Sequence, residues 1–140
     1  MSEMNKLPYR ILIGSLSYLA GRTRPDISYA VNILSQFQSN PGRMHWEALL
    51  KLLSYVISTK DFKLNLSNMQ DLNLTAYSDA AFASNRDDRT SMSGQIIFLD
   101  RVPISWRSSK QKSVSLSSME CEFVALTETA KELVYFRNSF

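Results

Sequence analysis

The first half of the chain shows the apolar spacing of helices. Between Tyr9 and Tyr55 apolar residues recur at steps of three and four, with breaks at Gly21–Asp26 and Ser39–Gly42. The spacing predicts three helices. The second runs from Pro25 to Phe37, because proline is tolerated in a first helical turn. The third is predicted to bury one stripe of side chains: Trp46, Leu49, Leu50, Leu53 and Ile57.

After Asp61 the pattern changes to the alternation that is typical of strands. Phe62, Leu64 and Leu66 alternate with polar residues and predict a half-buried strand. Three more strands are predicted further along the chain. Their ranges are Leu72–Asp79, Gly94–Leu99 and Val102–Trp106, with a polar connection over Ala83–Ser91 and a turn at Asp100–Arg101.

The last element is predicted to be a helix from Ser118 to Asn138, with Ser117 or Ser118 as its N-terminal cap. On a helical wheel its larger apolar residues form one stripe, which we expect to face the sheet. Glu120 and Glu122 flank opposite edges of that stripe. The stripe consists of Met119, Phe123, Leu126, Ala130, Leu133 and Val134.

Composition allows a packed core and limits the cellular setting. The chain has 140 residues, 44% of them hydrophobic, which suits one domain or two small units. The net charge of +3 permits contact with nucleic acid without requiring it. The single cysteine, Cys121, excludes an internal disulfide and fits a reducing compartment. No apolar run approaches the roughly 20 residues of a membrane-spanning helix, so we predict an intracellular protein without a membrane partner.

Asp79 is the first candidate for metal chemistry, because it ends an apolar strand that would hold its carboxylate rigidly. Metal-dependent nucleases place several carboxylates around paired Mg²⁺ ions. The alternative is that Asp79 caps a turn. Glu122 and Glu120 also carry plain alternatives, a solvated helix face and, for Glu120, a carboxylate favoured by the helix dipole. His45 and Cys121 are interpreted as structural residues.

A second candidate feature is a basic segment that starts at the turn between the last two predicted strands. Between Arg101 and Met119 there is no acidic residue, and several serines follow Trp106. Cations and hydroxyls are donor types that hold phosphate oxygens. The alternative is an ordinary solvated hairpin. The cations proposed for nucleic-acid contact are Arg107, Lys110 and Lys112.

Several motifs occur in a fixed order along almost the whole chain. Those of the first half are Tyr9–Leu19 and Thr23–Ile27. Those of the second half are Tyr77–Ala80, Asp88–Gly94, Ile104–Trp106, Lys110–Gln111 and Leu116–Phe123. This series resembles copia-type retrotransposon Pol polyproteins, over the segment that leads from the reverse transcriptase into the ribonuclease H domain.

The resemblance implies an α+β fold in two parts. Residues 1–65 would be a helical thumb or connection segment of the reverse transcriptase. Residues 66–140 would be a partial ribonuclease H-like domain, with antiparallel strands followed by a long helix. By motif, Asp79 and Glu122 would be the catalytic ligands of a two-ion Mg²⁺ site. Glu122 is preferred over Glu120 because it directly precedes the aromatic residue of the motif, here Phe123.

The resemblance also implies a substrate, partners and a location. The intact parent would hydrolyse the RNA strand of RNA/DNA hybrids during reverse transcription. Its partners would be the hybrid and the rest of the polyprotein, including the polymerase palm and integrase. The location would be the cytoplasm, within a virus-like particle, with the nucleus as a second site.

The chain departs from the family pattern in ways that bear on activity. Ala81 and Phe82 stand where the family usually has Asp and Trp. The sequence stops at Phe140, before the fourth strand that would carry the third ligand. We therefore expect a fragment with little or no nuclease activity. The alternatives are a decayed copy without function, and a remnant retained by the host that binds nucleic acid or protein without catalysis.

Overall fold

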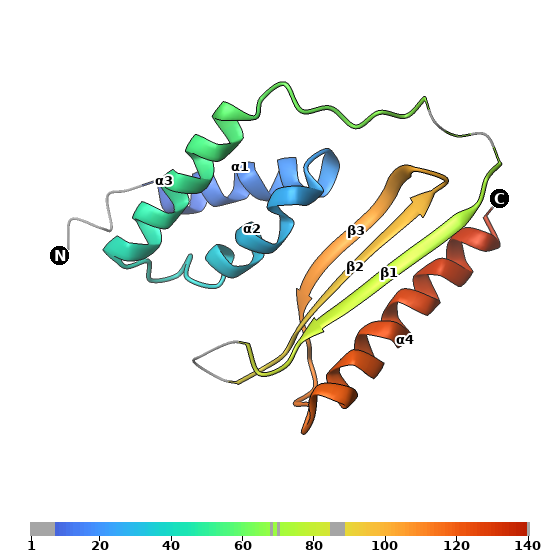
Figure 1. Cartoon of the computed structure of the whole chain (residues 1–140). Coiled ribbons are helices and arrows are strands. Elements are labelled where there is room, and N and C mark those ends of the chain that lie inside the picture. The colour runs from blue at the N-terminus through green and yellow to red at the C-terminus, as the bar shows by residue number, and fades with distance from the viewer. Residues whose placement is uncertain (1–7, 68, 70, 85–88, 140) are drawn as a thin grey trace. The chain divides into compact units, whose positions relative to one another are not determined.

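The chain folds into helices followed by a small sheet and a final helix, which confirms the predicted α+β class. The computed structural model describes residues 8–67, 69, 71–84 and 89–139. It divides into two compact units, Met1–Lys63 and Leu64–Phe140 (Figure 1). We call them the helical unit and the sheet unit. No helix in the described ranges is long and apolar enough to cross a membrane.

The helical unit contains the three predicted helices. They are α1 (Tyr9–Arg22), α2 (Ser28–Ser35) and α3 (Arg43–Ser58). A 3₁₀ turn over Pro25–Ile27 precedes α2, so the second helix is shorter than predicted. The buried side chains of the three helices form one core. It consists of Tyr9, Ile13, Leu16, Ala20, Ile27, Val31, Leu34 and Leu49.

The predicted buried stripe of α3 is partly wrong. Leu49 is fully buried, but Leu50 is 39% exposed and Ile57 is 60% exposed. Leu52 and Val56 pack against the core instead. Leu50 follows Leu49 by about 100° around the helix, which turns its side chain away from α1 and α2. Sequence spacing left this ambiguous because α3 is apolar over much of its surface.

A buried arginine, Arg24, connects distant segments of the helical unit. Arg24 is 5% exposed and makes a two-pronged ion pair with Asp26, with Nε–Oδ1 at 2.9 Å and Nη2–Oδ2 at 2.7 Å. It also donates to the carbonyl and hydroxyl of Thr59, at 3.2 and 2.6 Å. The Tyr55 hydroxyl donates to Asp26 at 3.0 Å. The cluster therefore fastens the turn after α1 to the end of α3.

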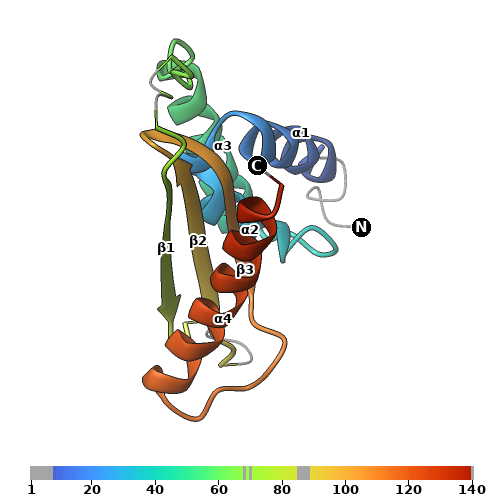
Figure 2. The same cartoon turned by 90° about the vertical axis from the view of Figure 1, so that its right-hand side faces the viewer.

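The sheet unit contains three antiparallel strands in the order β1-β2-β3. They are β1 (Leu74–Ala81), β2 (Met92–Leu99) and β3 (Val102–Lys110). The helix α4 (Ser118–Arg137) lies along one face of this sheet, mainly against β1 (Figure 2). The predicted connection between β1 and β2 includes residues 85–88, which lie outside the described part.

The strand predicted at Phe62–Leu66 is wrong, because this segment has no regular structure. Phe62 is 63% exposed and Leu66 is 58% exposed. A strand requires a partner backbone, and the described strands pair only with one another. A local turn competes instead, since the Asn65 side chain accepts a hydrogen bond from the Ser67 N–H at 3.0 Å.

The predicted turn at Asp100–Arg101 is confirmed, and it has a further contact. The Asp100 carboxylate accepts hydrogen bonds from the N–H groups of Asp71, Leu72 and Asn73, at 3.1, 3.3 and 2.9 Å. Asp100 has a φ of 55°, a left-handed conformation that aspartate tolerates better than most residues. One side chain therefore ties the β2–β3 turn to the segment entering β1.

The apolar stripe predicted for α4 exists, but the prediction that it faces the sheet is wrong. Met119, Phe123 and Leu126 are 79%, 69% and 56% exposed. The positions buried against the sheet carry small side chains: Cys121, Ala125 and Thr129. Small residues let the helix axis approach the strands closely, whereas the larger apolar residues stand on the outer side of the helix.

Candidate active site

Asp79 lies on the face of the sheet turned away from α4. The Thr129 hydroxyl of α4 donates to the Gln95 side chain at 3.4 Å, so Gln95 points toward the helix. Gln95 pairs directly with Ser78, and directly paired residues project to the same face. Because successive residues of a strand alternate, Asp79 projects to the opposite face, and it is exposed.

We call this second face the open face. Asp79 pairs there with Gly94, which carries no side chain. The rings of Tyr77 and Phe98 meet edge to face, with centroids 6.0 Å apart. Trp106 pairs with Ile96 and therefore shares the face. Asp79 is therefore exposed on a face that also carries the aromatic side chains of neighbouring strand positions.

Glu122 is exposed in the first turns of α4, directly after the buried Cys121. Glu120 has a different role, because its carboxylate accepts a hydrogen bond from the Leu116 N–H at 2.7 Å. Its own N–H donates to the Ser117 hydroxyl at 3.2 Å. Of the two serines predicted as possible caps, Ser117 and not Ser118 is the cap, and the interpretation of Glu120 as a helix N-terminal carboxylate is confirmed. Of the two glutamates, only Glu122 has no part in capping the helix.

A buried glutamine holds this end of α4 to the sheet. The Gln111 side-chain amide donates to the Ser93 hydroxyl and to the Cys121 carbonyl, each at 2.8 Å. Its oxygen accepts a hydrogen bond from the Ser115 hydroxyl at 3.0 Å. Sequence patterns identified Gln111 only as part of a motif and missed this role. No local signal marked it, because its partners Ser93 and Cys121 are distant in sequence.

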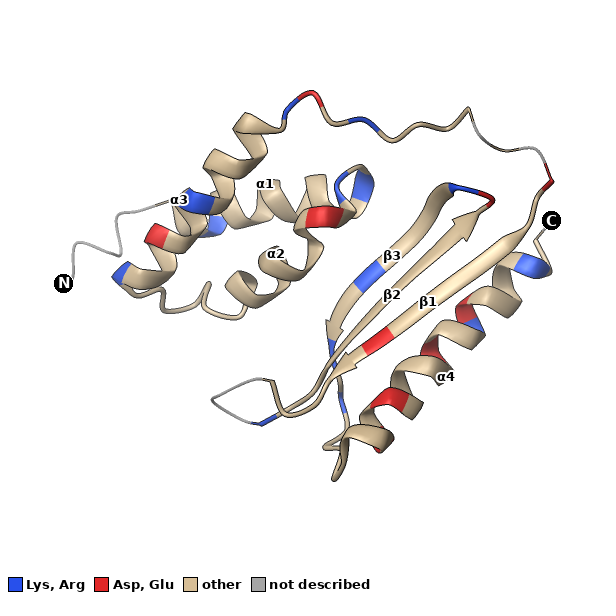
Figure 3. Ribbon diagram, in the orientation of Figure 1, with Lys and Arg blue, Asp and Glu red and all other residues tan. Residues whose placement is uncertain are grey.

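Asp79 is on β1 and Glu122 is on α4, and these two elements pack against each other. The two carboxylates nevertheless do not project from the same face of the sheet. Asp79 projects from the open face, whereas α4 covers the other face. β1 is an edge of the described sheet, so no neighbouring described strand separates the two sides there. Figure 3 shows the acidic positions on β1 and along α4.

The donor chemistry fits Mg²⁺, but the number of ligands does not complete a two-ion site. Exposed carboxylates are the oxygen ligands that this ion takes in proteins. In the described part of the chain, no three His, Cys, Asp or Glu residues gather closely enough to hold a metal. Asp79 and Glu122 therefore offer two of the several carboxylates that such a site uses.

The three cations named for nucleic-acid contact do not share a face. Arg107 pairs with Gln95 and so projects to the α4 side, whereas Lys110 pairs with Met92 and projects to the open face. Lys112 follows β3 and is exposed, as are the other two. Figure 3 shows basic positions along β3 and the segment after it. One flat surface of the sheet therefore cannot place all three cations against the same nucleic acid.

The sequence is similar to transposon Pol polyproteins. It is 48% identical over 132 residues to the retrovirus-related Pol polyprotein from transposon RE2 of Arabidopsis thaliana, covering 91% of this chain and 9% of that protein. It is 40% identical over 135 residues to the corresponding polyprotein from transposon TNT 1-94 of Nicotiana tabacum, covering 96% of this chain and 10% of that protein. The chain thus spans about a tenth of the length of these relatives.

A third relative has a different extent. The secreted RxLR effector protein 161 of Plasmopara viticola is 42% identical over 132 residues, which cover 94% of this chain and 93% of that protein. No family model and no solved structure matches the chain.

Proposed function

Because the chain belongs to the copia-type retrotransposon Pol polyprotein family, of which it is a short segment, we propose that its sheet unit contributes to a ribonuclease H site. Asp79 and Glu122 are the proposed Mg²⁺ ligands, and the proposed substrate is the RNA strand of an RNA/DNA hybrid. The helical unit is proposed to be the thumb or connection segment. The rest of the polyprotein, with its polymerase palm and integrase, is the proposed partner, in a cytoplasmic particle and in the nucleus.

One observation carries this proposal. The motif aspartate stands on an edge strand of an antiparallel sheet, and the motif glutamate stands in the helix packed against that strand. A bound Mg²⁺ would supply charge stabilisation and an activated water for phosphodiester hydrolysis. The protein residues would hold the ion and the duplex backbone. Two carboxylates give weak ion binding, so little or no cleavage is expected of the 140-residue chain alone.

Metal binding by the unmodified chain tests the two ligands. We expect weak Mn²⁺ binding, with a dissociation constant roughly in the millimolar range, because only two carboxylates contribute. Asp79→Asn and Glu122→Gln should each reduce the affinity at least several-fold, since each removes an anionic ligand. The measurement is electron paramagnetic resonance of free Mn²⁺, with the broadening of nearby amide signals by Mn²⁺ locating the bound ion.

Glu128→Gln is the matched control, because Glu128 is an exposed acid on the same helix and carries no proposed role. It should leave Mn²⁺ binding unchanged. Equal losses in all three variants would show that Mn²⁺ responds only to general negative charge and would contradict the site. Mg²⁺-dependent cleavage of a hybrid by the wild-type chain, lost in Asp79→Asn, would contradict the expected inactivity.

The Plasmopara viticola relative favours a second candidate function. That protein has nearly the same extent as this chain, so the two units also occur together without the remainder of a polyprotein. The second candidate is a binding protein that uses its basic segment to contact nucleic-acid phosphates without catalysis.

A binding assay separates the two candidates. For the second, salt-dependent binding of an RNA/DNA hybrid should survive Asp79→Asn and fall at least about tenfold when Arg107, Lys110 and Lys112 are all changed to Gln. Fluorescence anisotropy at several salt concentrations measures this. The control changes Arg10, Arg22 and Lys51 to Gln, three exposed cations of the helical unit. Equal losses in both triple variants would reject a specific role for the basic segment.

A further inference from the structure

The outer side of α4 carries a regular apolar pattern that the sheet does not use. Five apolar positions are spaced four, three, four and three residues apart, which is the spacing of a coiled-coil seam, and Arg137 continues it four residues further on. We call this set the outer stripe. It consists of the apolar residues Met119, Phe123, Leu126, Ala130 and Leu133, with the charged Arg137 at its C-terminal end.

Exposure distinguishes the outer stripe from ordinary surface. Met119, Phe123 and Leu126 are each more than half exposed, and Val134 beside the stripe is 50% exposed. The opposite side of the helix is already buried through Cys121, Ala125 and Thr129. Figures 1 and 2 show α4 covering the sheet with one side and facing outward with the other. A contiguous apolar strip of this kind marks an interaction surface.

We propose that the outer stripe is a dimer interface, in which α4 packs antiparallel against α4 of a second copy of this chain. The ends of the helix carry opposite charges, with Glu120 and Glu122 in its first turns and Arg137 in its last. Antiparallel pairing brings Arg137 of each copy beside Met119 and these two acids of the other. Parallel pairing would instead place the two Arg137 side chains together.

The sizes of the stripe residues also favour antiparallel pairing of the two helices. In the antiparallel register, Ala130 of one copy lies across from Leu126 of the other, and Phe123 lies across from Leu133. The one small apolar residue of the stripe then faces a large one, whereas parallel pairing would place the two Ala130 side chains together and leave that layer underfilled. From Met119 to Arg137 the stripe is about 27 Å long. Such an interface is small beside the roughly 1,200–2,000 Å² of stable complexes, so micromolar association is expected.

Sedimentation of the full chain tests the proposal. Between roughly 1 and 500 µM, a range that resolves weak complexes, the wild type should shift from monomer to dimer. Leu126→Glu should raise the dissociation constant at least about tenfold, since it places a charge in the central layers of both copies. Because Leu126 is 56% exposed, this change is compatible with folding, which circular dichroism verifies.

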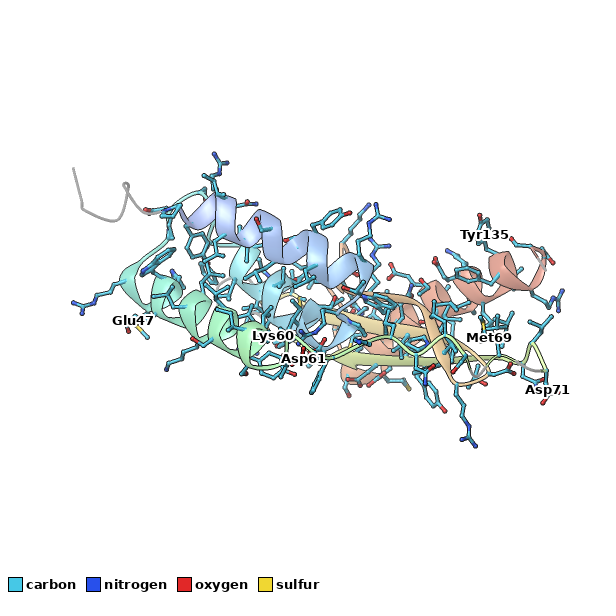
Figure 4. The ribbon with its side chains drawn as sticks, turned by 90° about the horizontal axis from the view of Figure 1, so that it is seen from above. Glu47, Lys60, Asp61, Met69, Asp71 and Tyr135 are labelled. Atoms are coloured by element: carbon cyan, nitrogen blue, oxygen red, sulfur yellow. The ribbon has the colours of Figure 1, made fainter. Side chains whose placement is uncertain are left out.

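Tyr135→Glu is the matched control. Tyr135 is 66% exposed and lies on α4, about 150° around the helix from the centre of the outer stripe. Figure 4 shows its side chain pointing away from the ribbon. This variant should dimerise like the wild type. A wild-type chain that stays monomeric at the highest concentration, or a dimer unaffected by Leu126→Glu, would overturn the proposal.

Charge exchange tests the direction of pairing. Arg137→Glu and Glu122→Arg should each weaken the dimer, and the double variant should regain most of the lost affinity. Cross-linking gives a separate reading. Leu133 lies in the stripe, about five residues from the antiparallel two-fold axis, so antiparallel pairing keeps two Leu133→Cys sulfurs about 15 Å apart along the helix, beyond disulfide reach. Parallel pairing would place them side by side, so a readily formed Leu133→Cys disulfide would overturn the proposed direction.

Discussion

Changing Arg24 to methionine is expected to destabilise the helical unit by about 3 kcal/mol. The guanidinium is buried and makes hydrogen bonds with Asp26 and with both oxygens of Thr59. Methionine fills similar volume but leaves Asp26 without its cation and the Thr59 carbonyl without this donor. Denaturant unfolding followed by Trp46 fluorescence, in a Trp106→Phe background, reports the helical unit.

Arg22→Met is the control for this prediction. Arg22 is exposed, and its guanidinium lies 5.6 Å from the centre of the Tyr18 ring. An exposed contact of this type contributes only about 0.5–1 kcal/mol. A loss in Arg24→Met no larger than in Arg22→Met would show that the buried cluster does not hold the helical unit together.

The same cluster gives the helical unit a dependence on acid pH. Hydrogen bonds from Arg24, opposed by burial and assisted by the Tyr55 hydroxyl and the Arg24 charge, lower the pKa of Asp26. A lowered folded-state pKa adds stability above the unfolded value of about 3.9, and this stability is lost as the pH falls through the folded pKa. Unfolding between pH 5 and roughly pH 2 should therefore depend less on pH in Arg24→Met.

Changing Gln111 to methionine is expected to destabilise the sheet unit by about 2–3 kcal/mol. The Gln111 side chain makes three hydrogen bonds, and the change leaves the buried Ser93 hydroxyl and the Cys121 carbonyl without this partner. The first turns of α4 should loosen more than its last turns, because Gln111 contacts only that end. Hydrogen exchange of α4 amides measures this gradient, and Trp106 fluorescence measures the total loss.

Lys112→Met separates this effect from a general change in the connection after β3. Lys112 is exposed and one residue away, so the variant should be close to wild type in both measurements. Uniform acceleration of exchange along α4 in Gln111→Met would argue against a local tether at its first turns.

Much of the fold follows from local patterns in the sequence. The helical spacing before Ser58 was sufficient to predict α1 and α3, and the turn at Asp100 was sufficient to predict the β2–β3 hairpin. The cap was also predictable to within two residues, Ser117 or Ser118, because a serine about three residues before a glutamate satisfies the first N–H groups of a helix. These signals are local and need no knowledge of the partner surface.

The errors arose where a pattern required a partner that sequence does not specify. Phe62, Leu64 and Leu66 alternate correctly, but no described strand lies beside them. The outer stripe of α4 has the stronger apolar signal, yet the small residues Cys121 and Ala125 meet the sheet. Periodicity measures how apolar one side of a helix is. It does not measure how closely a neighbouring sheet can approach.

The residues of the candidate site could likewise be predicted only in part. Motif resemblance named Asp79 and Glu122, and the structure supports a capping role for Glu120. The face of β1 from which Asp79 projects could not be predicted, because it depends on the register with β2 and on which side α4 covers. The role of Gln111 was missed because its three partners come from β2, the loop after β3 and α4.

Gly94 determines how much water surrounds Asp79. It lies directly across from Asp79, its φ is not positive, and a Cβ added to it would meet nothing within 4 Å. Neither strain nor crowding therefore requires glycine there. A side chain at this position would stand about 4.5–5.5 Å from the Asp79 Cβ and displace solvent from one side of the carboxylate. Substitutions at Gly94 therefore change the hydration of Asp79 while leaving the strand backbone intact.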